Sequence, residues 1–156
     1  MNIEGLFQAA FQYAERTIIK TQRQLPPTWT LINKNGENFV VITPWTNPTD
    51  KLLAEMQLRL EMQERKIIAY AFVIEAWSAR APEGWTPEKG GKLDQPSKRA
   101  DRKEVVIASV HDGKTIHVRV WNIKRDWHDR AASLELTDGE ANGFESWMTT
   151  LLEGSK

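Results

Sequence analysis

Ionisable side chains gather at the two ends of a long polar segment, and their types could do chemistry. Glu75 lies near the end of an apolar run, where a carboxylate must be paired, exposed or functional. If Glu75 is functional, it could act as a general base. Asp101 and Glu104 bring two acids close together, which suggests metal-dependent phosphodiester chemistry, although no lysine follows at the spacing of a nuclease motif. The favoured interpretation of Glu75 is structural: exposure, or an ion pair with a strand neighbour such as Arg119.

Arginines at the same two ends suggest a second kind of chemistry. Arg80 and Arg102 could come together where the two ends of the segment meet. There they could hold a phosphate or carboxylate through paired hydrogen bonds. The segment 80–104, however, carries seven Lys/Arg against five Asp/Glu, so its charge is mixed rather than basic. Ion pairs that fix the register of the flanking strands are therefore the favoured interpretation.

Other chemical motifs are absent or incomplete in the sequence. His111 and His117 could approach each other across two strands, and Asp112 or Asp129 could complete a metal site, but no HxH or HExxH spacing supports one. The chain has no cysteine, which excludes disulfides and a cysteine nucleophile. It also lacks the GxSxG, GxxxxGK[ST] and GxGxxG patterns. We expect no metal site and no cofactor.

The segment from Arg80 to Lys103 is itself a candidate binding region. Connections of this length without apolar periodicity are uncommon in compact domains and are usually functional when they are not linkers. Trp85 is isolated among charged residues, where it could stack on a base or sugar, anchor a partner, or pack back on the sheet. The predicted binding residues at this segment and its ends are Glu75, Arg80, Trp85, Asp101, Arg102, Glu104 and Arg119.

The composition describes one globular domain. We expect the 156 residues to form a single domain with a long mobile loop at about 80–103. Lys plus Arg and Asp plus Glu both number 21, so the net charge of zero makes a nucleic acid a less expected partner than a protein. The first residues lack the pattern of a secretory signal, and no run reaches the roughly 18 apolar residues of a membrane span. The sequence therefore predicts a soluble, cytoplasmic protein without a membrane partner.

Apolar periodicity and turn residues predict the elements that position these side chains. The expected elements, in chain order, are a helix over 3–23, a hairpin over 28–45, a helix over 48–66, strands over 67–78, 104–110 and 115–124, and a closing helix over 137–151. Asn47 and Pro48 mark the start of the second helix, after which Leu52, Leu53, Met56 and Leu60 line one face.

These elements predict an α+β fold. Its single, mostly antiparallel sheet would combine the hairpin with a three-strand meander, packed against N-terminal, central and C-terminal helices. The run 67–78 is almost continuously apolar, which is typical of a central strand. Residues 133–136 could add a short edge strand. We expect most of the seven tryptophans to be buried or half-buried, with Trp85 as the exception.

Three stretches of the sequence carry a resemblance to known proteins. They are Asn35–Glu37 with Val40–Trp45, then Tyr70–Trp77, and then Pro96–Val106. In this combination, which spans about residues 30–124, the chain resembles a family of small proteins of unknown function from bacteria and their phages. No activity is assigned to that family, so the resemblance implies no catalytic residue. It implies that the two ends of the long loop form one unit, made of Glu75, Trp77, Asp101, Arg102 and Glu104.

The sequence leaves three functions open. The first is a small non-catalytic interaction protein that binds a macromolecular partner, most simply a protein, through the 80–103 region. The second is an enzyme or small-ligand binder that uses a cluster of Glu75, Asp101, Arg102 and Glu104. The third is a self-assembling phage or mobile-element component, with a homo-oligomer as its signature. The first is favoured because no complete catalytic set appears elsewhere in the sequence.

Overall fold

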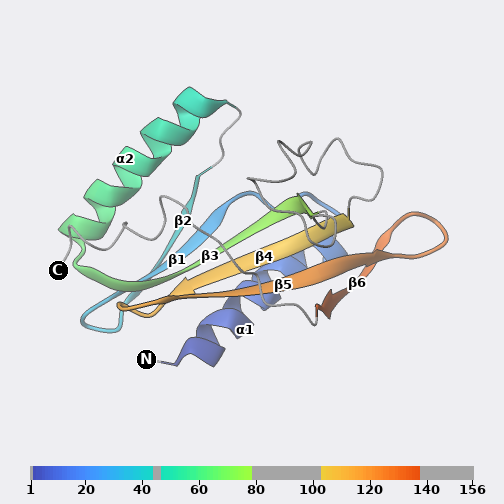
Figure 1. Cartoon of the computed structure of the whole chain (residues 1–156), viewed down its shortest axis with the longest axis horizontal. Helices are drawn as coiled ribbons and strands as arrows, with labels where there is room; N and C mark the ends of the chain where they lie inside the picture. The colour runs from blue at the N-terminus through green and yellow to red at the C-terminus, as the bar shows by residue number, and fades with distance from the viewer. Residues whose placement is uncertain (1, 44–46, 79–102, 138–156) are drawn as a thin grey trace, which may run out of the picture.

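The structure, a computed structural model, describes residues 2–43, 47–78 and 103–137. In these residues six strands form one antiparallel sheet in the order β2-β1-β3-β4-β5-β6 (Figure 1). The strands are β1 (Thr28–Asn33), β2 (Asn38–Ile42), β3 (Ile67–Ser78), β4 (Lys103–His111), β5 (Ile116–Arg125) and β6 (Ala131–Leu136). The expected α+β class with a single antiparallel sheet is therefore confirmed. β6 occupies the edge where the sequence allowed a short strand.

Local turn residues set the register of β1 on β2. The Asn33 side chain accepts hydrogen bonds from the backbone N–H groups of Asn35 and Glu37, at 3.0 and 2.9 Å. Gly36 has a φ of 82°, a left-handed conformation that favours glycine. The Asn35-Gly36 pair thus closes the hairpin where the sequence predicted it.

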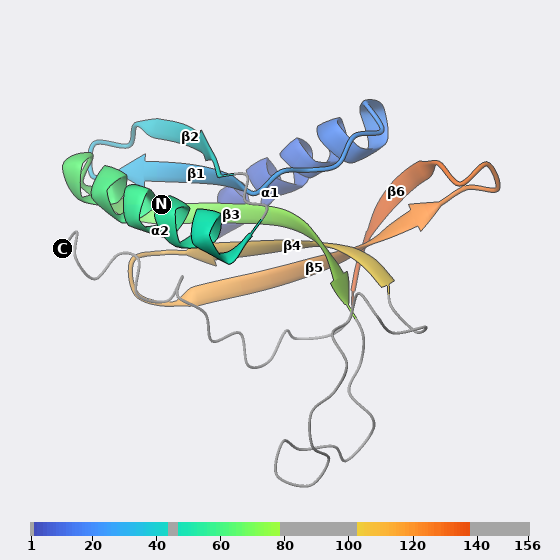
Figure 2. The same cartoon turned by 90° about the horizontal axis from the view of Figure 1, so that it is seen from above.

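Two helical segments lie on opposite faces of the sheet (Figure 2). The first is α1 (Ile3–Ala14), which continues as a π-helix, η1 (Glu15–Lys20). The second is α2 (Pro48–Glu64), and the Asn47 side chain caps it by accepting from the Asp50 N–H at 2.9 Å. Neither described helix is long and apolar enough to cross a membrane. The predicted closing helix lies outside the described residues, except for Thr137 at its start.

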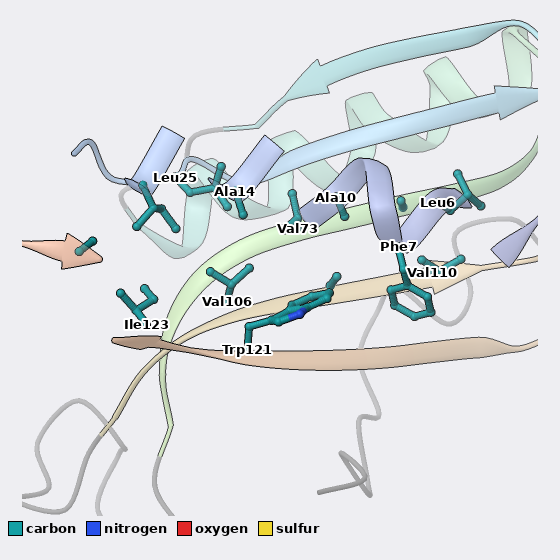
Figure 3. Close-up of a cluster of buried hydrophobic side chains, with 14 residues drawn as sticks. Leu6, Phe7, Ala10, Ala14, Leu25, Val73, Val106, Val110, Trp121 and Ile123 are labelled. Atoms are coloured by element: carbon teal, nitrogen blue, oxygen red, sulfur yellow. The ribbon is translucent and has the colours of Figure 1, made fainter. Parts of the chain in front are cut away.

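The core on the α1 side is the larger of the two (Figure 3). Alternate residues of β3, β4 and β5 point to this face, and α1 and η1 cover them. Phe11 packs on Trp121 with ring centroids 5.7 Å apart. The buried members of this core are Leu6, Phe7, Ala10, Ala14, Ile18, Leu25, Ala71, Val73, Val106, Ala108, Val110, Trp121, Ile123 and Ala131.

The core on the α2 side is built around aromatic rings. Trp29 is fully buried and stacks on Phe72, with centroids 4.1 Å apart. Its indole N–H donates to the Thr43 hydroxyl at 2.8 Å. Leu58 and Met62 bring α2 down onto these rings. Leu58 and Met62 are thus the buried residues of α2 that join it to the sheet.

The tryptophans follow the sequence prediction only in part. Trp29 and Trp121 are buried, as expected. Trp77 is exposed because it lies near the end of β3, beyond both cores. Trp127 is 89% exposed in the turn between β5 and β6, where it lies against the ring of His128. The prediction is wrong for these two, and Trp45, Trp85 and Trp147 lie outside the described residues.

Candidate functional site

Glu75 lies at the end of β3 on the face that α1 covers. It continues the alternation of Ala71 and Val73, but it stands just beyond the core those residues form. Its Oε1 accepts a hydrogen bond from the backbone N–H of Leu25 at 3.1 Å. Burial raises the pKa of Glu75, the Leu25 N–H opposes that rise, and the neighbouring Glu104 carboxylate adds to it. The carboxylate is therefore half-buried and tied to the segment that leads into β1.

Glu104 and Arg125 form a two-pronged ion pair beside Glu75. The Arg125 Nε donates to Glu104 Oε2 at 2.6 Å, and Nη2 donates to Oε1 at 3.0 Å. The remaining Nη1 donates to the backbone carbonyl of Asp129 at 2.9 Å. The hydrogen bonds to Glu104 raise the pKa of Arg125. This geometry joins β4 to the end of β5 and leaves the guanidinium already committed to protein acceptors.

A small polar cavity of about 250 Å³ adjoins Glu75 and Arg125. Gln22 forms part of its wall just after η1 and has a φ of 52°, an uncommon value for a non-glycine residue. Its side-chain amide donates to the Ala131 carbonyl at 2.8 Å and accepts from the Ala131 N–H at 2.9 Å. The strained backbone of Gln22 thus serves to pair its side chain with the edge strand β6, which is a structural role.

Of the seven predicted binding residues, Glu75 and Glu104 come together and Arg119 does not join them. Arg119 lies over the ring of Phe7 at 4.2 Å and forms an ion pair with Glu4, with Nη1 donating to Oε2 at 2.9 Å. The arginine that reaches the loop ends is Arg125, which the sequence analysis did not single out. Arg80, Trp85, Asp101 and Arg102 lie outside the described residues, so their part in the predicted region stays a prediction.

The histidines do not converge. Val110 is paired directly with His117, so His117 and the next residue of β4, His111, point to opposite faces of the sheet. His111 packs near Tyr70 on one face, and His117 lies 3.1 Å from an Asp112 carboxylate oxygen on the other. Within residues 2–43, 47–78 and 103–137, no three His, Asp or Glu side chains are arranged to hold a metal ion.

The charged groups at the described loop ends form a clasp, which we define as Leu25, Glu75, Glu104 and Arg125. Its hydrogen bonds tie the segment before β1 to β3, and β4 to β5. In a site built for a charged ligand, side chains point at a common space with unsatisfied donors or acceptors. Here the guanidinium and one carboxylate satisfy each other instead. The arrangement fits a structural closure of the sheet at the ends of β3 and β4.

A second feature lies on α2, where the sequence predicted a face shared by four apolar residues. Leu52, Leu53, Met56 and Leu60 share one side of the helix, as expected, and their exposed fractions are 57, 59, 55 and 60%. We call these four residues the outer stripe. The side that packs on the sheet is the one with Leu58 and Met62, which are 2% and 0% exposed. The four residues predicted to share a face therefore lie on the side of α2 that points away from the sheet.

The physical reason is that α2 carries apolar residues on two opposed sides. Met56 and Leu60 are each two residues from Leu58, which places them about 160° away from it around the helix. Spacing alone cannot tell which of two apolar sides meets the sheet. The sequence did carry one signal. Leu58 and Met62 fall outside the side that the other four residues form, so a single apolar face does not explain all six positions.

Comparison of the sequence with models of protein families and with curated proteins finds no match, and comparison of the fold with solved structures finds none either.

Proposed function

We propose that this chain is a non-catalytic interaction protein that binds a protein partner, with the outer stripe of α2 as its described contact surface. The observation that carries the proposal is the exposure of four large aliphatic side chains on one side of one helix. Single exposed hydrophobic residues are ordinary, but a contiguous set of this kind is typical of an interaction site. The predicted loop at 80–103 remains a second candidate surface for the same partner.

The charge of α2 favours a protein over a membrane or a nucleic acid. Helices that lie on anionic lipid carry Lys and Arg on the polar side, and nucleic acid is bound by basic surfaces. Within Pro48–Glu64 there are more acids than bases: Asp50, Glu55, Glu61 and Glu64 against Lys51 and Arg59. Glu55 is further paired with Arg59 at 3.0 Å. A partner with an apolar surface bordered by basic residues would fit this helix.

The clasp supports a non-catalytic function over the enzyme alternative. That alternative uses a cluster of Glu75, Asp101, Arg102 and Glu104, and Arg119 is a further predicted binding residue. In the described residues, Glu104 is held by Arg125, and Arg119 is held by Glu4. The absence of cysteine fits a protein that acts in a reducing compartment, and we place the function in the cytoplasm on that ground.

The test compares two neighbouring variants of the full chain. Met56→Glu adds a charge to the outer stripe, and Gln57→Glu adds the same charge at the next, also exposed, position. A protein captured by the immobilised wild-type chain is purified, and its affinity for each variant is measured by calorimetry. We expect Met56→Glu to weaken binding at least about tenfold, because a carboxylate would be buried against an apolar partner, and Gln57→Glu to change it less than about twofold.

Two results would contradict the proposal. Equal affinity of the partner for both variants would show that the outer stripe takes no part in binding. Binding that survives Met56→Glu but is lost when residues 84–95 are deleted would assign the partner surface to the loop instead. Circular dichroism of each variant checks that α2 is intact, which we expect because Met56 and Gln57 are both exposed.

A further inference from the structure

β2 is an edge of the sheet whose outward backbone groups can be identified. The Asn33 N–H donates to the Glu37 carbonyl at 3.1 Å, and the Thr43 N–H donates to the Pro27 carbonyl at 3.0 Å. In an antiparallel ladder, alternate residues of a strand bond to the same neighbour, so residues 37, 39, 41 and 43 bond to β1. The intervening residues direct their N–H and C=O groups away from the sheet, and they are Asn38, Val40 and Ile42.

The side chains of these outward residues are also exposed. Val40 and Ile42 are 49% and 53% exposed, on the face of the sheet that carries α1. The strand from Asn38 to Thr43 contains no charged residue and no proline. Edge strands of natural proteins are usually protected by charge, proline, a bulge or a covering element. β2 has neither of the first two.

The opposite edge, β6, does have such protection. The backbone N–H and carbonyl of Ala131 are both bonded by the Gln22 side chain. Glu135 adds a charge farther along the same strand, where it lies 3.9 Å from the Lys124 ammonium. Among the described residues, the two edges of the sheet therefore differ: β6 carries a charge and a side-chain cover, whereas β2 carries neither charge nor proline.

We propose that two copies of this chain associate through β2, with the two strands antiparallel about a twofold axis at Val40. Each Val40 would then exchange two backbone hydrogen bonds with its counterpart, and Asn38 would do the same with Ile42 of the second copy, because these residues carry the outward groups. The two sheets become one continuous sheet. The inference concerns β2 and does not rest on the function proposed for the outer stripe of α2, of which Leu53 also lines the groove beside β2.

The other face of β2 offers a place for the second copy's side chains. In the same register, Phe39 of the second copy comes beside Val41. Val41 forms part of a groove of about 290 Å³ between β2 and α2, together with Leu53 and Leu58. An aromatic side chain would therefore reach a mixed recess, which Asp50, Gln57 and Glu61 also line, at the point where the two strands meet.

We favour a second copy over an unrelated strand because the sequence of β2 suits a twofold axis, which requires that no charged residue lie near it. Residues near the axis meet their own counterparts, so any charge there would face a like charge at close range. β2 is a strand in which every residue tolerates this arrangement. The five-residue strand gives a small contact, so we expect a dimer that dissociates in the micromolar range rather than an obligate one.

The experiment measures the mass of the full chain by sedimentation equilibrium over a range of concentrations. We expect a reversible dimer in the wild type, and a dissociation constant at least about tenfold weaker in Val40→Lys, which places two like charges at the axis. The matched control is Leu136→Lys, an exposed aliphatic residue on the other edge strand, where we expect less than about a twofold change. A monomeric wild-type chain, or equal effects of the two substitutions, would overturn the proposal.

Crosslinking provides a second measurement that does not depend on charge. The chain has no cysteine, so Val40→Cys introduces a single thiol. Directly opposed, hydrogen-bonded residues have Cα atoms about 5.5 Å apart, within the range that a disulfide spans. We expect mild oxidation to convert Val40→Cys to a covalent dimer and to leave Leu136→Cys largely uncrosslinked. Crosslinking of both variants at the same rate would indicate random collision and count against the interface.

Discussion

Replacing Leu58 and Leu60 by alanine, one at a time, tests which side of α2 is held by the sheet. The two residues have the same type and lie two positions apart in one helix, but Leu58 is 2% exposed and Leu60 is 60% exposed. Alanine is a slightly better helix former than leucine, and this gain is equal at both sites, so it cancels in the comparison. The difference between the two variants therefore isolates burial.

The expected magnitudes follow from the burial of each side chain. Leu58→Ala removes about three buried carbon groups at roughly 0.8 kcal/mol each, or about 2.4 kcal/mol, and the cavity left behind adds to this. Leu58 also borders the groove between α2 and β2, where neighbouring side chains can move, so we expect a total of about 2.5–3.5 kcal/mol. Leu60→Ala loses only the covered part of its side chain, at most about 1 kcal/mol.

The assay is urea unfolding of the full chain, followed by tryptophan fluorescence. Trp29, one of seven tryptophans, lies in the same core as Leu58, so part of the emission reports on this packing. In thermal unfolding, Leu58→Ala should lower the Tm by about 5–12 °C and Leu60→Ala by less than about 4 °C. If Leu60→Ala costs as much as Leu58→Ala, the outer stripe is covered in the folded chain. That result would refute the orientation of α2 and remove the basis for a partner surface there.

Three further perturbations test the structure elsewhere. Thr43→Val keeps the side-chain shape but removes the hydroxyl that accepts from the buried Trp29 indole N–H, so we expect urea unfolding to show a loss of about 1–3 kcal/mol. Gly113→Ala should cost about 1–3 kcal/mol by the same assay, since the φ of 98° disfavours a side chain and the new Cβ would lie 3.0 Å from the Ile68 carbonyl oxygen. Burial raises the pKa of Glu75 above the ordinary value of 4.5, so the folded state binds this proton more tightly than the unfolded state. The free energy of unfolding should therefore fall as pH rises from that value through the folded pKa, and Glu75→Gln should remove this decline; parallel pH profiles of wild type and variant would contradict the assignment.

The outward direction of Val40 and Ile42 could not be foreseen from the sequence, although the hairpin that contains them could. Asn35-Gly36 predicts the turn from two adjacent residues, and the alternation of β2 follows from the period of a strand. Both faces of β2 carry apolar residues, so neither is marked as the solvent side. Which edge of the sheet stays open depends on where β3 is placed, and that is a long-range pairing.

Most of the described elements could be predicted from the sequence, because their signals are local. Asn47-Pro48 starts α2, and Asp112-Gly113 turns β4 into β5, each through backbone preferences of a few neighbouring residues. The continuous apolar run of β3 marked it as a central strand, since both of its faces had to be covered. Class and element order follow from such signals without any knowledge of contacts.

The pairing of the charged residues and the buried side of α2 depend instead on contacts between distant parts of the chain. Arg119 pairs with Glu4, which is 115 residues away, and Arg125 takes the place beside Glu104 that the sequence left open. An ion pair depends on where two elements come to rest, and charges of either sign were available at several positions. α2 likewise offered two apolar sides, and the sheet selected the one with Leu58 and Met62 because their side chains meet the aromatic core of Trp29.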